Sequence, residues 1–444
     1  MAGVRFIFSH AFHLGWPEAT SDNACVGYGG KINVQLRHSW LYGGGQLYQL
    51  LVDEVMAQSL TGNIENMIGW TKVPLGQAGP LLVNNKNYDL SLATTEGALV
   101  ASVNRGCKAT RLSGGIKVLV ENVGATRGPV FRVKGIDEGK KLINWVKDNF
   151  KLVQKAAEAT SQHLKLVDFT STMAGKNAWL RFRFNTGEAM GMNMVTIATQ
   201  KIVELIEDKL KIKCLALSGN FCVDKKANWL NFIEGRGKKV WAEAMIKRII
   251  VKDVLKTTPE KIIEVVKSKQ WLGSIMSGSM GANGHFANIA AALFLATGQD
   301  MAHVVEASLG VTIAELQSGS ASRRATCSHL PGEARGCARR SAWPAPDLYF
   351  SVYLPDLMVG MVGGGTRLPS QQQVLKMLGN PSAIELAGII GGSVLAGELS
   401  LTAALASGDL AKAHQKLGRP KPTRSDLLGN KSPIRSDLNG ARYD

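Results

Sequence analysis

Two extended segments flank one long helical segment in VFRVKGIDEGKKLINWVKDNFKLVQKAAEATSQHLKLVDF, residues 130–169. Apolar residues recur every three or four positions from Asp137 to Thr160, which predicts an amphipathic helix. A third strand is predicted at Ala178–Phe184, a second helix at Met194–Ile206 and a short last strand at Cys214–Leu217. The resulting order, β-α-β-β-α-β, is typical of a ferredoxin-like sandwich in which two helices cover an antiparallel sheet.

The sequence on either side of this unit predicts a larger domain into which the unit is inserted. Gly284–Thr297 contains the uncharged run NIAAALFLAT, which predicts a buried helix. Residues 240–266 are charged and are predicted to be helical, with a new helix beginning at Pro259. Together these elements indicate a fold of the α+β class.

The composition is that of a folded protein with an excess of positive charge. The 444 residues include 52 Lys and Arg against 35 Asp and Glu, which gives a net charge of +17, and 45% of the residues are hydrophobic. This charge suits a nucleic acid, an anionic membrane surface or a phosphate-rich small molecule. No helix-turn-helix, zinc or RNP signature accompanies it, so we expect no nucleic-acid partner.

Nothing in the sequence predicts a metal site, a disulfide framework or a membrane span. The six cysteines show no CxxC spacing. The most apolar stretch, Leu386–Ala406, contains Glu398 and several glycines, and the N-terminus is a poor signal peptide. We therefore expect a cytoplasmic protein with no bound metal and no membrane contact.

Four polar side chains stand out as candidates for acid–base chemistry. Glu96 lies in an apolar, glycine-containing turn, Lys225 follows the last strand of the inserted unit, Asp300 ends the apolar helix, and His414 ends a late helix. A carboxyl group in an apolar setting can donate a proton, and a lysine near a carbonyl can stabilise an oxyanion. Taken singly, each is more commonly explained as a helix-capping or surface residue.

Two glycine-containing motifs could let the backbone approach a ligand closely. EAMGMNM, residues 188–194, opens the second helix of the inserted unit, where a helix N-terminus favours a phosphate. GMVGGGT, residues 360–366, could cradle a ligand or form a plain turn. Neither contains GxGxxG, so a Rossmann fold is not indicated.

The order of these motifs resembles that of 3-hydroxy-3-methylglutaryl-coenzyme A (HMG-CoA) reductases. The motifs that carry the resemblance are ENMIG, GPLLV, TTEG, NRG, TRGPV, EAMGMNM, SGN-x-C-x-DKK, EGRGK, GHFANI, GQD, DLYFSV, GGGT, AGELSLTAALA and AKAH. They span about residues 60–318 and 347–418 and are similar to the soluble, archaeal-type branch of the class I enzymes.

The resemblance implies a large, mainly helical substrate-binding domain with a long buried central helix, interrupted by a small ferredoxin-like dinucleotide-binding domain. The expected parts are an atypical N-terminal segment at 1–50, the large domain at 51–127, 218–318 and 347–414, the small NADP(H)-binding domain at 128–217, an anomalous insertion at 319–346 and a basic tail at 415–444.

The resemblance also implies a reaction, in which two hydride transfers from NADPH reduce the HMG-CoA thioester to mevalonate and free CoA. Lys225 would stabilise the oxyanion, Glu96 would donate a proton, Asp300 would link the two, and His414 would protonate the departing CoA. Family members are dimers or tetramers, and the resemblance implies that Lys225 crosses to Glu96 and Asp300 of a neighbouring subunit.

The resemblance implies three groups of ligand contacts. The acyl carboxylate would meet Arg127, Ser218, Asp224, Lys226, Lys269 and Asn288. Coenzyme A would lie along Ser102, Asn104 and Arg105. The dinucleotide would be held by Ser161, Glu188, Met190, Gly191, Met192, Asn193, Gly363 and Gly364.

Departures from the family pattern leave alternatives open. Gln162 stands where the family often has an arginine for the 2′-phosphate of NADPH, so NADH is a possible cofactor. Glu188 replaces the usual aspartate. A non-catalytic or assembly-defective relative, or an NAD-dependent enzyme that oxidises mevalonate, are the competing hypotheses.

Overall fold

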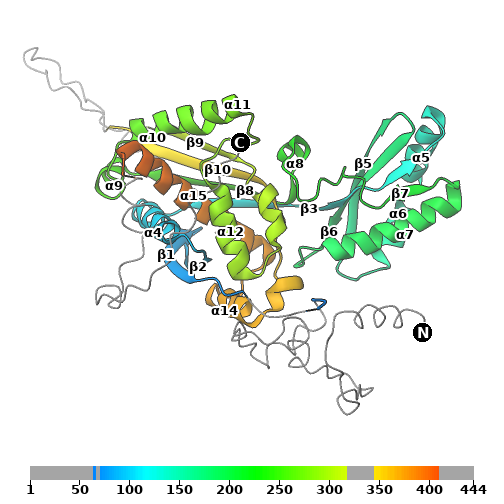
Figure 1. The fold of residues 1–444 in the computed structure, drawn as a ribbon, viewed down its shortest axis with the longest axis horizontal. Coiled ribbons are helices and arrows are strands. Elements are labelled where there is room, and N and C mark those ends of the chain that lie inside the picture. Colours follow the sequence, from blue (N-terminus) through cyan, green and yellow to red (C-terminus); the bar gives the residue numbers. More distant parts are fainter. Residues whose placement is uncertain (1–63, 67–70, 318–344, 410–444) are drawn as a thin grey trace, which may run out of the picture. The chain divides into compact units, whose positions relative to one another are not determined.

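The computed structural model describes residues 64–66, 71–317 and 345–409 (Figure 1). The chain divides into two units, Met1–Lys72 and Val73–Asp444, and the fold below is that of the second unit. The predictions for 1–50, 415–444, His414 and nearly all of 319–346 lie outside the described residues.

The inserted unit has the element order that the sequence predicts. Its strands follow the order β7-β4-β6, with β5 on the other edge of β6, and every pair is antiparallel. The elements are β4 (Val130–Arg132), α5 (Ile136–Asp148), α6 (Phe150–Glu158), β5 (Lys165–Ala174), β6 (Asn177–Asn185), α7 (Met192–Leu210) and β7 (Cys214–Ala216). The single helix expected over 137–160 is two helices, because the backbone leaves the helical conformation at Asn149, whose side-chain amide bonds the Trp145 carbonyl.

The hydrophobic core of this unit lies between its helices and one face of its sheet. Leu142 and Val146 of α5, Val153 of α6 and Ile202 of α7 are completely buried, and so is Phe182 of β6. These positions follow the three- and four-residue spacing seen in the sequence, so apolar periodicity alone places both helices.

A second core surrounds the four remaining strands of the large sheet. The strands β3 (Lys117–Arg127), β8 (Arg236–Ile246), β10 (Asp347–Leu357) and β9 (Val311–Gln317) are neighbours in that order and antiparallel. The C-terminal residues of β3 also pair with β6, so this one strand belongs to both parts of the sheet (Figure 1). A separate hairpin consists of β1 (Leu75–Val83) and β2 (Lys86–Ala93).

The prediction of a helix over 240–266 is wrong for residues 240–246, because these residues belong to β8. Buried and less buried positions alternate along Val240–Ile246, and β8 pairs with a strand on each side. The two neighbouring strands satisfy its backbone groups, and this tertiary context outweighs the helix propensity of Ala, Glu and Met. The helix start at Pro259 is confirmed, with the Thr258 hydroxyl accepting a bond from the Lys261 amide.

The longest helix, α15 (Ala383–Ser407), lies buried in the second core. It is the one helix among the described residues that is long and apolar enough to cross a membrane, yet 83% of its most apolar window is buried inside the protein, as in a core helix. Gly106 of α4 contacts the backbone of Ala396 so closely that a side chain there would clash. The buried Glu398 carboxylate accepts bonds from the amides of Gly284 and His285 and from Thr312 Oγ1, which offsets its burial.

The remaining helices surround this core. They are α4 (Gly97–Leu112), α8 (Trp229–Glu234), α9 (Arg248–Asp253), α10 (Pro259–Val265), the π-helix η2 (Val266–Gly273), α11 (Ser274–Ser277), α12 (Phe286–Thr297), the 3₁₀ turn η3 (Met301–His303), α13 (Val304–Ala307), the 3₁₀ turn η4 (Gly364–Arg367) and α14 (Pro369–Met377). The predicted apolar helix at 284–297 is α12, and the α+β class is confirmed.

Candidate active site

Lys225 and Asp300, 75 positions apart in the sequence, form an ion pair. Lys225 Nζ lies 2.8 Å from Asp300 Oδ2, and the two side chains are 41% and 35% exposed. Lys225 belongs to the loop between β7 and α8, while Asp300 caps η3 by accepting a bond from the Ala302 amide. Burial raises the pKa of Asp300, but the bonds from Lys225 and Ala302 outweigh burial and hold that pKa below its usual value. The pair therefore presents an oriented ammonium group at the surface.

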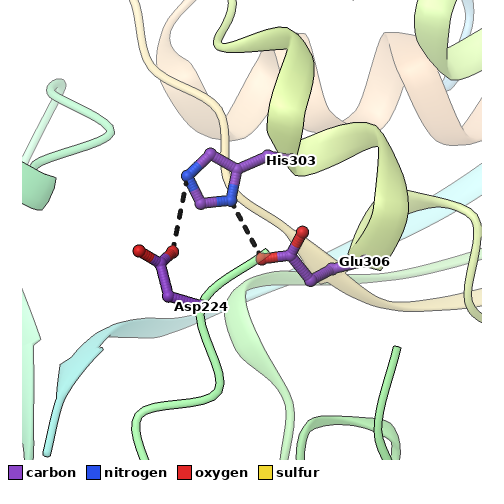
Figure 2. A group of neighbouring side chains, drawn as sticks. All are labelled: Asp224, His303 and Glu306. Atoms are coloured by element: carbon purple, nitrogen blue, oxygen red, sulfur yellow. Dashed lines mark hydrogen bonds and ion pairs between the residues drawn. The ribbon is translucent and has the colours of Figure 1, made fainter. Parts of the chain in front are cut away.

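A buried set of charged residues lies directly behind this pair, and we call Asp224, Arg236, His303 and Glu306 the Arg236 cluster. The Arg236 guanidinium donates to Asp224 Oδ1 at 2.8 Å and to Glu306 Oε1 at 3.0 Å. His303 lies between the two carboxylates (Figure 2), with Nδ1 3.0 Å from Glu306 Oε1 and Nε2 3.7 Å from Asp224 Oδ1. Glu306 Oε1 also accepts the backbone N–H of Lys225 at 2.6 Å, so the cluster fixes the loop that carries the lysine.

Arg236 connects this cluster to two further elements. Its side chain is completely buried, its Nε donates to Thr126 Oγ1 of β3, and its Nη2 lies 3.1 Å from the sulfur of Met192, the first residue of α7. Because a buried charge needs partners on all sides, Arg236 is where β3, β8, α7 and the lysine loop are joined.

The acids of the cluster are poorly suited to a metal ion. The ligand atoms of Asp224, His303 and Glu306 lie within 4.8 Å of one another, which is close enough to surround a cation. However, Arg236 already donates to both carboxylates, and Lys225 adds a second positive charge nearby. A divalent cation would therefore have to displace or repel Arg236.

Glu96 lies apart from the ion pair within this chain. It is exposed at the start of α4, and its Oε2 accepts a bond of 3.3 Å from the Asn288 side chain. Among the described residues, no hydrogen bond or ion pair joins Glu96 to Lys225 or Asp300. The structure thus brings together two of the four predicted catalytic residues and pairs the third with Asn288, a predicted substrate contact. The Lys225–Asp300 pair also forms inside one chain, whereas the resemblance placed it between subunits.

The other predicted acyl contacts lie on different elements: Arg127 on β3, Lys269 on η2, and Ser218 and Lys226 in the loop between β7 and α8. Ser218, Lys226 and Lys269 are exposed, and Lys226 Nζ donates to the backbone oxygen of Asp224. Arg127, at the end of β3, donates to Thr196 Oγ1 of α7. Ser218 Oγ is 3.3 Å from the sulfur of the buried Cys222.

Two of the three predicted CoA contacts, Asn104 and Arg105, border a cavity of about 670 Å³. We call it the α4 pocket, and it is lined by Gly79, Ala101, Asn104, Arg105, Lys108, Arg111, Asp253, Val254 and Lys256. Ser102 and Arg105 both bond Ser400 Oγ, which anchors them to α15. Sequence reasoning missed Lys108, Arg111 and Lys256. The first two stand four and seven positions after Asn104 on α4, so helical spacing could have revealed them.

The two glycine motifs predicted to hold a dinucleotide lie side by side. Met361 N donates to the Glu188 carbonyl oxygen, and Ala189 and Val362 form a parallel bridge. Gly191 precedes α7 with a φ of 92°, and no acidic residue occupies the first turn of that helix, so its N-terminus suits a phosphate.

Four of the predicted cofactor contacts, Gly363, Gly364, Glu188 and Ser161, differ in their surroundings. A side chain at Gly363 or Gly364 would meet nothing within 4 Å, which leaves open space beside the motif. The Glu188 side chain bonds the Ala383 amide at the start of α15. Ser161 Oγ accepts from the His163 amide, in the loop that follows α6, and no hydrogen bond between described residues joins it to the two motifs.

Comparison with known proteins identifies one enzyme family. The family model for hydroxymethylglutaryl-coenzyme A reductase matches residues 40–419, and so begins within the N-terminal segment that was expected to be atypical. The 3-hydroxy-3-methylglutaryl-coenzyme A reductase of Methanocaldococcus jannaschii is 44% identical over 402 residues, which cover 88% of this chain and 90% of that protein. The enzyme of the same name from Aeropyrum pernix is 47% identical over 377 residues, which cover 82% and 83%.

A solved structure supports the fold. The class II 3-hydroxy-3-methylglutaryl-CoA reductase of Streptococcus pneumoniae, bound to NADPH, superposes with a TM-score of 0.61. The superposition covers 80% of this chain and 89% of that one, at 19% sequence identity.

Proposed function

Because the chain belongs to the hydroxymethylglutaryl-coenzyme A reductase family, we propose that it reduces the HMG-CoA thioester to mevalonate and free CoA with NADPH. The observation that carries the proposal is the Lys225–Asp300 ion pair, held at the surface by buried charges. A fixed ammonium group is what a thioester carbonyl needs when negative charge develops on its oxygen.

The proton transfers are assigned to two residues. Glu96 is exposed and bonded to Asn288, so its carboxyl group is available to protonate the carbonyl oxygen. His414 is proposed to protonate the departing CoA thiolate, by the resemblance alone, since it lies outside the described residues.

The ligands are proposed to occupy three neighbouring regions. The acyl carboxylate would bind Lys226, Lys269 and Asn288, whose side chains are exposed, together with Arg127 and Ser218, and Asp224 would lie beside it. The phosphates of CoA would bind the basic residues of the α4 pocket. The dinucleotide, which supplies the hydrides when bound, would be held by Met190–Asn193 and by Gly363 and Gly364, with Glu188 holding the motif against α15 and Ser161 near the adenosine end.

A second copy of the chain is proposed to complete the site. Lys225 and Asp300 meet within one chain, whereas no hydrogen bond or ion pair between described residues joins Glu96 to them there. A homodimer or homotetramer in which a neighbouring Glu96 approaches this pair would join all three. We further propose a cytoplasmic location and the domain boundaries given from the sequence, with the small domain at 128–217.

The decisive experiment is a product assay on the purified protein. HMG-CoA and NADPH should yield mevalonate and free thiol, with two NADPH oxidised for each CoA released, and NADH should be tested in parallel because of Gln162. Folded protein that oxidises no NADPH at saturating HMG-CoA would contradict the proposal. Faster NAD-dependent oxidation of mevalonate would favour the reverse reaction, and a monomer without activity would favour an assembly-defective relative.

A further inference from the structure

The buried His303 has acidic neighbours at both ring nitrogens. Its side chain is completely buried. Nδ1 lies 3.0 Å from Glu306 Oε1, while Nε2 lies 3.6 Å from Asp300 Oδ2 and 3.7 Å from Asp224 Oδ1. Nε2 is buried and makes no hydrogen bond, which is unusual for a ring nitrogen in a protein interior.

The protonation of the Nδ1 side follows from the donors around Glu306. Three groups converge on Glu306 Oε1: the Lys225 amide at 2.6 Å, Arg236 Nη1 at 3.0 Å and His303 Nδ1. An oxygen that faces two certain N–H donors accepts from both, and a carboxylate accepts from a third as well. Nδ1 therefore carries a hydrogen and donates it to Glu306.

The groups around Nε2 then decide whether the His303 ring is neutral or an imidazolium. A neutral ring protonated at Nδ1 would direct the lone pair of Nε2 at the oxygens of Asp224 and Asp300. Asp224 is ion-paired with Arg236 and Asp300 with Lys225, so both oxygens are negatively charged acceptors. A lone pair facing two anions is repelled, whereas an N–H is attracted.

Counting the charges that contact His303, together with their ion-pair partners, gives the same answer. The negative groups are Asp224 in the lysine loop, Asp300 at η3 and Glu306 in α13, and the positive ones are Lys225 and Arg236 of β8. A third positive charge at His303 makes this set neutral, and the nearby pair of Arg181 and Glu234 adds no net charge. Asp356, behind Arg236, adds little because burial raises its pKa to about 8 and so favours its neutral form near pH 7.

We propose that His303 is an imidazolium that positions Asp300, whose carboxylate pairs with Lys225 Nζ, and Glu306, which accepts the Lys225 amide. It is a positioning residue, since it acts on the lysine through the two carboxylates. The role of His303 in thioester reduction rests on the proposed function. Its protonated state does not, because that state follows from contacts within the protein itself.

Nitrogen NMR of ¹⁵N-histidine-labelled full-length protein tests the protonated state directly. We expect both ring nitrogens of His303 to show the chemical shifts of protonated imidazolium nitrogens near neutral pH, assigned by their loss in His303→Gln. A nitrogen shift typical of an unprotonated Nε2 overturns the proposal, whether or not the protein is an active reductase.

Kinetics of two variants and one control test the positioning role. His303→Leu removes both N–H donors and is expected to lower kcat by up to about 100-fold with a much smaller change in KM. His303→Gln keeps a donor toward Glu306 and should recover part of that loss. Lys147→Gln, at an exposed position of α5, should leave kcat unchanged.

Three further outcomes separate this proposal from its competitors. Wild-type kcat in His303→Leu overturns the positioning role. Activity that depends on added Zn²⁺ or Mg²⁺, or that is removed by EDTA, would identify the cluster as a metal site instead. If wild-type protein shows no reductase activity, the proposed function fails, while the NMR measurement still decides the protonated state.

Discussion

The Arg236 cluster and the α4 pocket are both rich in charged residues, but the charges are buried and paired in the cluster and exposed in the pocket. In the cluster, Arg236 and Glu306 are completely buried, and each charge is met by another within the chain. In the pocket, Lys108, Arg111 and Lys256 are exposed, and no ion pair is found for them among the described residues. Charges that are compensated internally fix the position of a reactive group, whereas the excess of exposed positive charge in the pocket remains available to an anionic ligand.

The largest effect is expected from removing the central charge of the cluster. Arg236→Met leaves the carboxylates of Asp224 and Glu306 without their main partner, and should lower the free energy of unfolding by about 3–5 kcal/mol. Urea denaturation of the variant measures this loss. The control is Lys201→Met, which removes an exposed ion pair with Glu204 and should change stability little. Equal stability of both variants would mean that the buried charge of Arg236 contributes no more to stability than the exposed charge of Lys201.

A smaller effect is expected from the buried acid behind the cluster. Burial raises the pKa of Asp356 to about 8 against the opposing charge of Arg236, so the folded chain holds a proton that the unfolded chain releases near pH 4. Stability from this group is therefore greatest at low pH and is lost as the pH rises through that window, by at most roughly 1.4 kcal/mol per pH unit. Asp356→Asn should gain stability relative to wild type from about pH 5 to about pH 8 in urea unfolding. Parallel pH curves for the two proteins would contradict this assignment.

The α4 pocket should respond in binding rather than in stability. The double variant Lys108→Ala, Lys256→Ala is expected to weaken CoA binding by about tenfold, roughly 1.4 kcal/mol, and to flatten its salt dependence. Isothermal titration with CoA at two salt concentrations measures both. Lys209→Ala, an exposed lysine outside the pocket, is the matched control and should bind like wild type. If the double variant were destabilised but bound CoA with unchanged affinity, these two lysines would stabilise the fold, as Arg236 does, and would not bind the ligand.

The smallest expected effect concerns chemical reactivity in α4. Burial raises the pKa of the Cys107 thiol to about 12, so native protein should leave it in the unreactive thiol form. Peptide mapping after iodoacetamide treatment near pH 8 should find Cys107 unmodified in the native state and modified after unfolding. Rapid labelling of the native protein would show that the helix behind the pocket opens readily.

The sequence predicted the inserted unit well because its order depends on local apolar spacing, as at Leu142 and Val146. It did not predict β8, where pairing with two distant strands decides the structure of Val240–Ile246. Lys225 and Asp300 were candidates from the sequence around each of them, but their joint catalytic roles came from the resemblance, since no spacing rule joins residues 75 positions apart. Arg236 was visible only as part of the EGRGK motif, because nothing in a sequence reveals that an arginine is buried among His303, Asp224 and Glu306.

Lys225 is proposed to act in the chemical step, whereas the α4 pocket is proposed to bind CoA. One variant, with its turnover and its CoA affinity both measured, is the most direct test of this difference. Lys225→Ala should lower the rate of HMG-CoA reduction by at least about 100-fold, while the dissociation constant for CoA stays within error of wild type. That pair of results would place the ammonium group in the chemical step and the CoA contacts elsewhere. Undiminished turnover, or loss of CoA binding together with turnover in folded protein, would contradict it.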